Sequence, residues 1–137
     1  MTSPEAAAAE APRKGLRRRT KFILYFLVLP ILVFIFYIFS ALNWSYSDGY
    51  RAGILQKFSK KGFICKTWEG EVQQSVVTGV APVFWKFSVR NEAVAAQLGA
   101  IVGQKVNLHY REHIGLPTSC WGDTSYFVDS VSVVKDE

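Results

Sequence analysis

Apolar and polar residues divide the chain into three stretches. Residues 22–42, FILYFLVLPILVFIFYIFSAL, contain no charged side chain. As a helix this stretch would be about 31 Å long, which matches the hydrocarbon core of a bilayer. It is longer than the apolar core of a cleaved signal peptide, and residues 40–43 make a poor cleavage site. We therefore predict a transmembrane signal-anchor helix over 22–42, between a disordered tail, 1–21, and a domain, 43–137.

The charges on either side of this stretch predict its orientation. Six Lys and Arg residues lie between Arg13 and Lys21, whereas residues 43–48 contain none. Basic flanks stay in the cytoplasm, so the domain that follows should be exported. Trp44 and Tyr46 would lie at the outer membrane interface. We expect a single-pass protein of a bacterial inner membrane with a periplasmic C-terminal domain, and the lipid bilayer is one expected partner.

The domain alternates apolar and polar residues with the period of a β-strand. The alternation is clearest over 83–89 and 106–110. Strands are also expected over 51–59, 63–72 and 126–134. Residues 73–82 show no pattern that places them.

One helix should interrupt these strands. Asn91 is a suitable N-cap, and Val94, Leu98 and Ile101 form one apolar stripe before Gly103. A helix between the third and fourth of five strands is the order of an OB-type β-barrel. The sequence therefore predicts a mainly β domain of this type. An open β-sandwich or a different small barrel is the alternative.

The net charge bears on the possible partners. The formal charge is +5, and most of the excess lies in the tail 1–21, which leaves the domain nearly neutral. A nucleic-acid binder usually carries its positive charge on the folded domain. Export also separates the domain from cytoplasmic nucleic acid. The expected partners therefore include no nucleic acid.

Two cysteines, Cys65 and Cys120, allow three interpretations. An oxidising compartment favours a disulfide between them. Two free buried thiols are a second possibility. A reactive thiol next to His109 or His113 is a third, although the C-x-x-C spacing of thioredoxin-like sites is absent.

A candidate contact surface combines the polar faces of the expected strands with the loop before the last strand. OB barrels commonly bind ligands on their second and third strands and on this loop. Trp121 lies in that loop and is the best single candidate for a residue that contacts the ligand. The alternative is that Trp121 covers the core. Glu69 and Glu71 could form a carboxylate pair, but a solvated strand face is the simpler interpretation. The candidates are Trp121, Tyr126, Thr67, Glu69, Lys86, Arg90, His109 and Arg111.

A protease-like motif needs separate treatment. Residues 109–113 spell H-x-x-E-H, which binds zinc only when a helix places both histidines on one face. The alternation before it predicts a strand, in which His109 and His113 would lie about 13 Å apart. We therefore expect no metal, no cofactor and no catalytic residue.

Several motifs resemble one known family. They are SDGYRAG at 47–53, KFSKKG at 57–62, KTWEGE at 66–71, PTSCWG at 117–122 and YFV at 126–128. These stretches are similar to small single-pass bacterial envelope proteins of unassigned function, some of which carry the label 6-phosphogluconate dehydrogenase. The resemblance implies an envelope protein and supplies no mechanism.

The dehydrogenase label can be tested on the residues. A nicotinamide site needs G-x-G-x-x-G between a strand and a helix N-terminus. The nearest glycines, Gly99 and Gly103, lie at the expected end of a helix, where the helix dipole disfavours phosphate. We therefore predict a membrane-anchored periplasmic binding or assembly module without catalytic activity. It would bind a protein partner, an envelope component or a small ligand. The alternative is an accessory subunit of a larger membrane complex that docks through its transmembrane helix.

Overall fold

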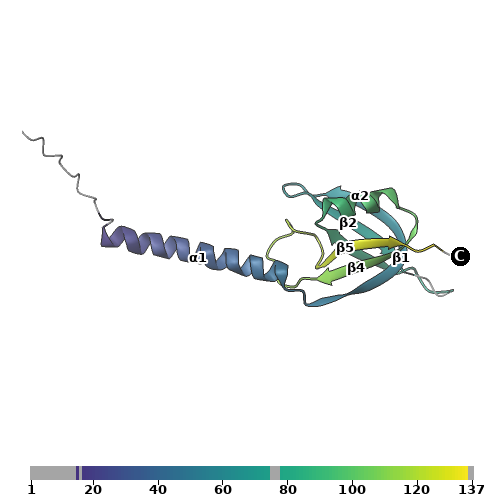
Figure 1. The fold of residues 1–137 in the computed structure, drawn as a ribbon, viewed down its shortest axis with the longest axis horizontal. Coiled ribbons are helices and arrows are strands. Elements are labelled where there is room, and N and C mark those ends of the chain that lie inside the picture. The colour runs from purple at the N-terminus through teal and green to yellow at the C-terminus, as the bar shows by residue number, and fades with distance from the viewer. Residues whose placement is uncertain (1–14, 16, 75–77, 136–137) are drawn as a thin grey trace, which may run out of the picture. The chain divides into compact units, whose positions relative to one another are not determined.

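The computed structural model describes residues 15, 17–74 and 78–135 and divides into two compact units, 1–36 and 37–137 (Figure 1). Most of helix α1 (Arg18–Asn43) belongs to the first unit, where its apolar side chains are exposed. By length and composition α1 could cross a membrane, although a signal sequence near the N-terminus would meet the same description. The expected disordered tail, 1–21, lies largely outside the described residues.

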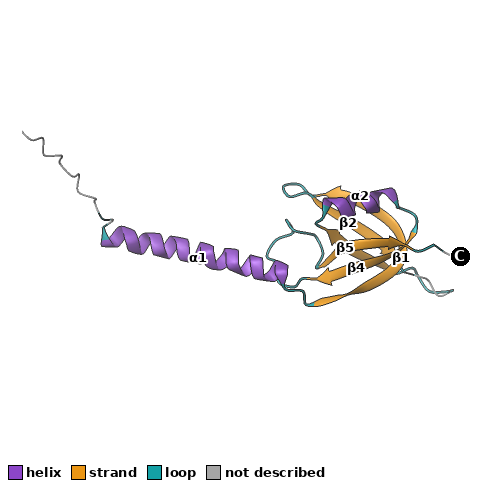
Figure 2. Ribbon diagram, viewed as in Figure 1, coloured by secondary structure: helices purple, strands orange, loops and turns teal. Residues whose placement is uncertain are grey.

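The second unit is a closed five-stranded barrel with one additional helix, as the sequence predicts (Figure 2). Around the barrel the strands follow the order β1-β2-β3-β5-β4. Helix α2 lies between β3 and β4 in the chain. The elements are β1 (Ser47–Lys61), β2 (Thr67–Gln73), β3 (Phe84–Val89), α2 (Glu92–Ala100), β4 (Lys105–Glu112) and β5 (Tyr126–Val133).

The core follows from the alternation along the strands. Trp85, Phe87 and Val89 point inward from β3, and Val106 and Leu108 point inward from β4. Each such burial contributes about 1.5–3 kcal/mol relative to an exposed side chain. Helix α2 closes the core with its apolar stripe, and its N-cap is Asn91, whose side chain accepts a hydrogen bond from the backbone N–H of Ala93.

Strand β1 is long because it pairs with two neighbours in turn. Its first half pairs with β4 and its second half with β2, and Ile54 lies at the change between them. Gly53 permits this bend, because a Cβ there would overlap the Val72 side chain and the Gln73 carbonyl. The expected strand over 51–59 therefore covers only the middle of β1.

Two further boundaries differ from the predicted ones. The strand expected over 63–72 begins only at Thr67, and Phe63 and Ile64 lie in a loop with their side chains exposed. Val83 lies outside β3 and is exposed too. Phe63, Ile64 and Val83 thus continue the apolar pattern of a strand. Among the described residues no neighbouring strand pairs with them, so the strands do not extend to these residues.

Candidate ligand-binding face

The outer face of β1, β2 and β3 carries two rows of polar side chains. In one row Glu71 of β2 pairs with Lys57 of β1 on one side and Lys86 of β3 on the other. In the next row Glu69 lies between Ser59 and Ser88. Side chains alternate between the two faces of a strand, so these rows point away from the core.

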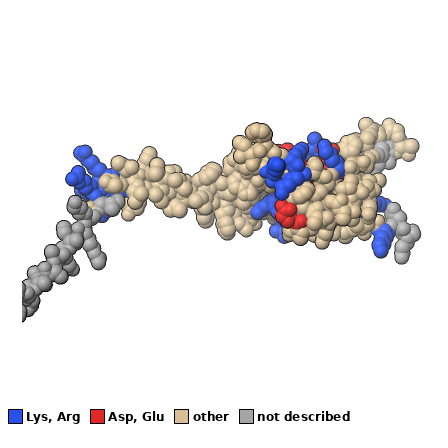
Figure 3. All heavy atoms as spheres, turned by 90° about the horizontal axis from the view of Figure 1, so that it is seen from above, with Lys and Arg blue, Asp and Glu red and all other residues tan. Residues whose placement is uncertain are grey.

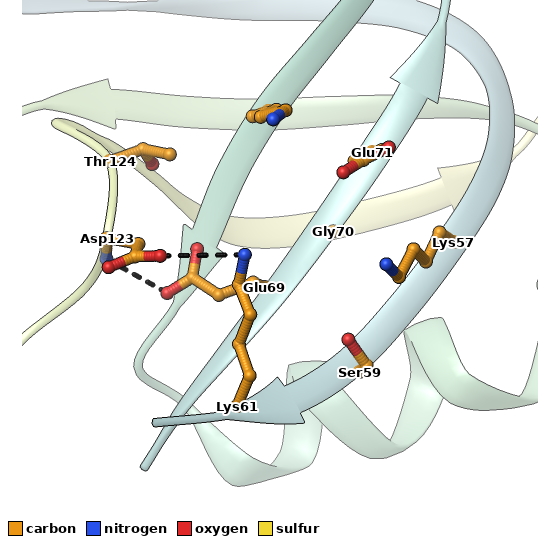
Figure 4. Close-up of a pocket in the computed structure, with 9 residues that line it drawn as sticks. Lys57, Ser59, Lys61, Glu69, Gly70, Glu71, Asp123 and Thr124 are labelled. Atoms are coloured by element: carbon orange, nitrogen blue, oxygen red, sulfur yellow. Dashed lines mark hydrogen bonds and ion pairs between the residues drawn. The ribbon is translucent and has the colours of Figure 1, made fainter. Parts of the chain in front are cut away.

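A pocket of about 230 Å³ lies over these rows (Figure 4). The loop between β4 and β5 contributes Asp123 and Thr124 to its wall. Lys61 reaches across from the end of β1, and its Nζ lies 3.5 Å from Oδ2 of Asp123. Strand side chains and one loop thus surround a polar pocket. Its lining residues are Lys57, Ser59, Lys61, Glu69, Gly70, Glu71, Lys86, Asp123 and Thr124.

Glu69 fixes that loop against the strands. It is only 6% exposed, and its carboxylate accepts hydrogen bonds from the hydroxyls of Thr67 and Ser88, each at 2.7 Å. It also accepts one from the backbone N–H of Asp123 at 3.0 Å. Hydrogen bonds to an ionised acceptor are about twice as strong as neutral ones. Glu69 is therefore a buried acceptor that positions the wall of the pocket.

A disulfide joins two loops beside the pocket. Cys65 lies in the loop between β1 and β2, and Cys120 lies in the loop between β4 and β5, with their Cα atoms 4.9 Å apart. A second pocket of about 390 Å³ lies between these loops, and Lys61, Thr67 and Asp123 line it. In OB barrels these two loops and the β2–β3 face bind oligonucleotides and oligosaccharides. The disulfide therefore restrains both loops at the position where such barrels bind.

The structure divides the predicted contact surface among separate places. Glu69 and Lys86 line the pocket, and Thr67 contacts it through its hydrogen bond to Glu69. Trp121 is half-buried in the β4–β5 loop. Tyr126 points inward instead, because its ring packs edge-on against Trp85 and Tyr110 within the barrel.

The other three candidates lie around β5. Arg90 and Arg111 line a different pocket, of about 380 Å³, together with Asp129. Arg111 Nε lies 3.0 Å from Oδ2 of Asp129, and the His109 ring contacts the other oxygen of that carboxylate. His109, Arg111 and Asp129 thus form a polar cluster on β4 and β5, apart from the pocket of Glu69, and Arg90 lies beside this cluster just after β3.

The second histidine of the H-x-x-E-H motif has another environment. His113 is buried, and its Nδ1 lies 3.0 Å from the carbonyl oxygen of Ala41 and 3.1 Å from that of Trp44. In the part of the chain that the structure describes, no three His, Cys, Asp or Glu side chains are arranged to hold a metal ion.

Several lining residues escape prediction from the sequence. Lys57, Ser59 and Lys61 alternate along β1, which is a visible pattern, but their partners on β2 depend on the register. That register shifts between Leu55 and Lys57, at a β-bulge. Asp123 gave no signal, because its position depends on the hydrogen bond to Glu69.

Comparison with solved structures defines the class of this fold. Two crystal structures of mitochondrial single-stranded DNA-binding proteins from S. cerevisiae, both Rim1 in form 2, match with TM-scores of 0.51 and 0.50. Both are 11% identical to this chain and cover 69% of it, and the match spans 99% and 100% of the respective Rim1 chains. The domain is thus an OB-type barrel similar to those proteins.

A family model identifies the sequence family to which the chain belongs. Residues 44–135 match a family described as a domain of unknown function (DUF8785), and the chain belongs to this family. No curated protein matches the chain.

The structural likeness corrects one expectation. The sequence predicts no nucleic-acid partner, because the domain is nearly neutral and is expected to be exported. That exclusion is wrong, because both similar structures are single-stranded DNA-binding proteins.

Proposed function

We propose that the protein is a membrane-anchored binding module without catalytic activity, whose barrel is exported and whose N-terminus stays in the cytoplasm. The apolar helix α1 supports the anchor, and the basic residues before it support the orientation. A disulfide between the two loops suits an oxidising compartment. A bacterial inner membrane with the barrel in the periplasm fits all three features. The same location also agrees with the resemblance to envelope proteins.

The observation that carries the binding role is the polar pocket over β1, β2 and β3. It lies on the face that OB barrels use for ligands, beside loops that a disulfide holds together. Its buried carboxylate, Glu69, already accepts three hydrogen bonds from the protein. Glu69 thus holds the loop in place. This structural role of the carboxylate supports a binding function of the pocket and not a catalytic one.

The chemistry of the pocket indicates the class of ligand. Lysines, carboxylates and hydroxyls alternate across it, so it presents donors and acceptors of both signs. Its volume, about 230 Å³, lies below the range of about 300–1,000 Å³ that is usual for pockets of drug-sized ligands. The pocket therefore fits one unit of a longer polar chain. An envelope glycan strand is the ligand that we favour.

The structural likeness supports a second candidate. A single-stranded nucleic acid could lie along the same face, with phosphates near Lys57 and Lys86. Its binding would weaken steeply with added salt, because phosphate contacts release counterions. Binding of a neutral glycan would respond little to salt.

The test measures binding of glycan fragments and of an oligothymidylate to the full chain in detergent micelles. Replacing Lys57 and Lys86 together by Ala should lower the affinity for the ligand at least tenfold, because a hydrogen bond to a charged group contributes about 1.5–3 kcal/mol. Lys135→Ala, after the end of β5, is the matched control and should leave affinity unchanged. Equal affinity of both variants for every ligand would contradict a role for this pocket.

A further inference from the structure

The loop between β1 and β2 exposes two large apolar side chains. Phe63 is 100% exposed and Ile64 is 90% exposed. We call these two residues the apolar loop tip. A fully exposed Phe next to an exposed Ile leaves much apolar surface in contact with water, and exposed apolar surface is a mark of sites that a partner or a membrane covers.

Basic residues surround the apolar loop tip. Lys60, Lys61 and Lys66 flank it, and residues 60–66 contain no acidic side chain. Lys60 and Lys61 each form one exposed ion pair at 3.5 Å, with Glu92 and Asp123 respectively. Lys66 has no ion pair among the described residues. Lys and Arg side chains also gather on the face of the barrel domain that Figure 3 presents.

The strand register places this loop at the end of the barrel where the chain enters β1. Lys61 pairs with Thr67, and the next residue, Trp68, pairs with the last residue of β3. Near that end of β3, Ser88 pairs with Phe127 of β5, and the preceding residue, Tyr126, pairs with Glu112 of β4, which pairs in turn with Ser47. The first residues of β1 and the apolar loop tip therefore belong to one end of the barrel.

The same end is tied to the last turns of α1, which belong to the barrel's own unit. The Tyr37 hydroxyl donates a hydrogen bond of 2.7 Å to the carbonyl of Gly115 in the β4–β5 loop. The disulfide then connects that loop to the β1–β2 loop. Trp44 and Tyr46, directly after α1, are exposed as well. Aromatic residues of this kind are enriched at membrane interfaces.

We propose that the apolar loop tip inserts into the interfacial layer of the bilayer that α1 spans, with its flanking lysines at the lipid phosphates. The proposal rests on the membrane anchoring proposed above and adds a second contact with the same membrane. Exposed apolar side chains next to basic ones are the combination that binds anionic bilayer surfaces. This contact would hold the pocket over β1–β3 close to the membrane surface, where lipid-linked or surface-bound chains lie.

The experiment uses the full chain in vesicles that contain anionic lipid. A photo-cross-linking phenylalanine analogue replaces Phe63, or Phe84 as the matched control, or Phe26 as the probe of the anchor. Phe84 is exposed too, but it pairs with Gln73 at the other end of β2 and β3. We expect lipid adducts at positions 26 and 63 and none at 84.

The outcomes separate the two proposals. Adducts at 26 without adducts at 63 would overturn the second contact and leave the anchor in place, and a protein adduct at 63 would replace lipid by a protein partner. No adduct at 26 would overturn the anchor. Equal adducts at 63 and 84 would show unspecific contact and would also overturn the proposal.

A charge variant provides an independent check. Replacing Lys60, Lys61 and Lys66 by Gln should lower the lipid adduct at position 63 about fivefold or more in anionic vesicles. Lys135→Gln should not change it. An unchanged adduct in the triple variant, with the disulfide intact by mass spectrometry, would contradict the role of the lysines.

Discussion

Glu69 shows how one side chain can connect a strand to a loop. Its carboxylate accepts bonds from two hydroxyls and one backbone N–H, so it is buried at little cost. The side chain of Glu71, two residues along the same strand, has no hydrogen bond or ion pair among the described residues. The two glutamates look equivalent in the sequence, and the hydrogen bonds from Thr67, Ser88 and Asp123 distinguish Glu69 from Glu71.

The pair makes a prediction about stability. Glu69→Ala should lower the free energy of unfolding by about 1–3 kcal/mol, because it leaves the Ser88 hydroxyl and the Asp123 N–H without their acceptor. Glu71→Ala is the control and should change it by less than about 0.5 kcal/mol. Urea unfolding of both variants measures the difference. Equal stability would contradict the positioning role of Glu69.

Two glycines make a second prediction at this scale. Gly70 faces the Phe87 ring, which a Cβ would overlap, whereas Gly99 in α2 has open space around it. Gly70→Ala should therefore destabilise the barrel by about 1–3 kcal/mol through overpacking. Gly99→Ala should stabilise it by about 0.5–1 kcal/mol, because alanine favours the helix. Thermal unfolding checks both signs, and a neutral Gly70→Ala would refute the packing described here.

Among the elements, the two disulfide-linked loops are the part of the barrel domain that lies outside the strand pairing. They connect different strand pairs, β1 with β2 and β4 with β5, and they meet beside the pocket. The strands fix both ends of each loop, Glu69 holds the β4–β5 loop at Asp123, and the disulfide joins the two loops to each other. Ligand binding by the loops should therefore depend on the disulfide more strongly than the folding of the barrel does.

Reduction of the disulfide tests this dependence. A loop closed over a sequence separation of 55 contributes about 4 kcal/mol in the chain-entropy model. We expect the Cys65→Ser and Cys120→Ser double variant to lose about that much stability and to bind ligand more weakly. Denaturant unfolding with and without reductant measures the first effect. If reductant changed neither stability nor affinity, the loops would not need the bond.

The sequence predicts elements well where a strand is paired at both edges and buried on one face. In β3 and β4 the inward positions carry large apolar residues, so their alternation is visible. The first half of β1 lacks this signal, because Gly49, Arg51 and Gly53 point inward there. Phe63 and Ile64 give a false strand signal, because they are apolar without being buried.

The pocket was predictable only in part, for a related reason. Alternation showed that Glu69 and Lys86 point outward, and the family of barrels indicated the face. The register that places Lys57 opposite Glu71 depends on a bulge and on long-range pairing. The sequence predicts Tyr126 as a contact residue because an aromatic ring can stack on a ligand, but its ring packs against Trp85 inside the barrel.

At the scale of the whole molecule, an apolar helix precedes an OB-type barrel that carries a polar pocket. Each part alone is common, since α1 could also be a signal sequence and OB barrels bind many kinds of ligand. What the proposal adds is their combination in one exported, anchored chain. The disulfide, the contact of the loop tip with lipid and the choice of ligand all depend on the side of the membrane on which the barrel lies.

The most direct measurement of that claim places a reporter after Glu137 in a bacterial host. One fusion carries an enzyme that is active only after export, and a second carries a reporter that is active only in the cytosol. A control joins the export-dependent enzyme directly after Lys21, without α1. We expect the export-dependent enzyme to be active and membrane-bound after Glu137, and inactive after Lys21. Activity of the cytosolic reporter alone after Glu137 would contradict the account.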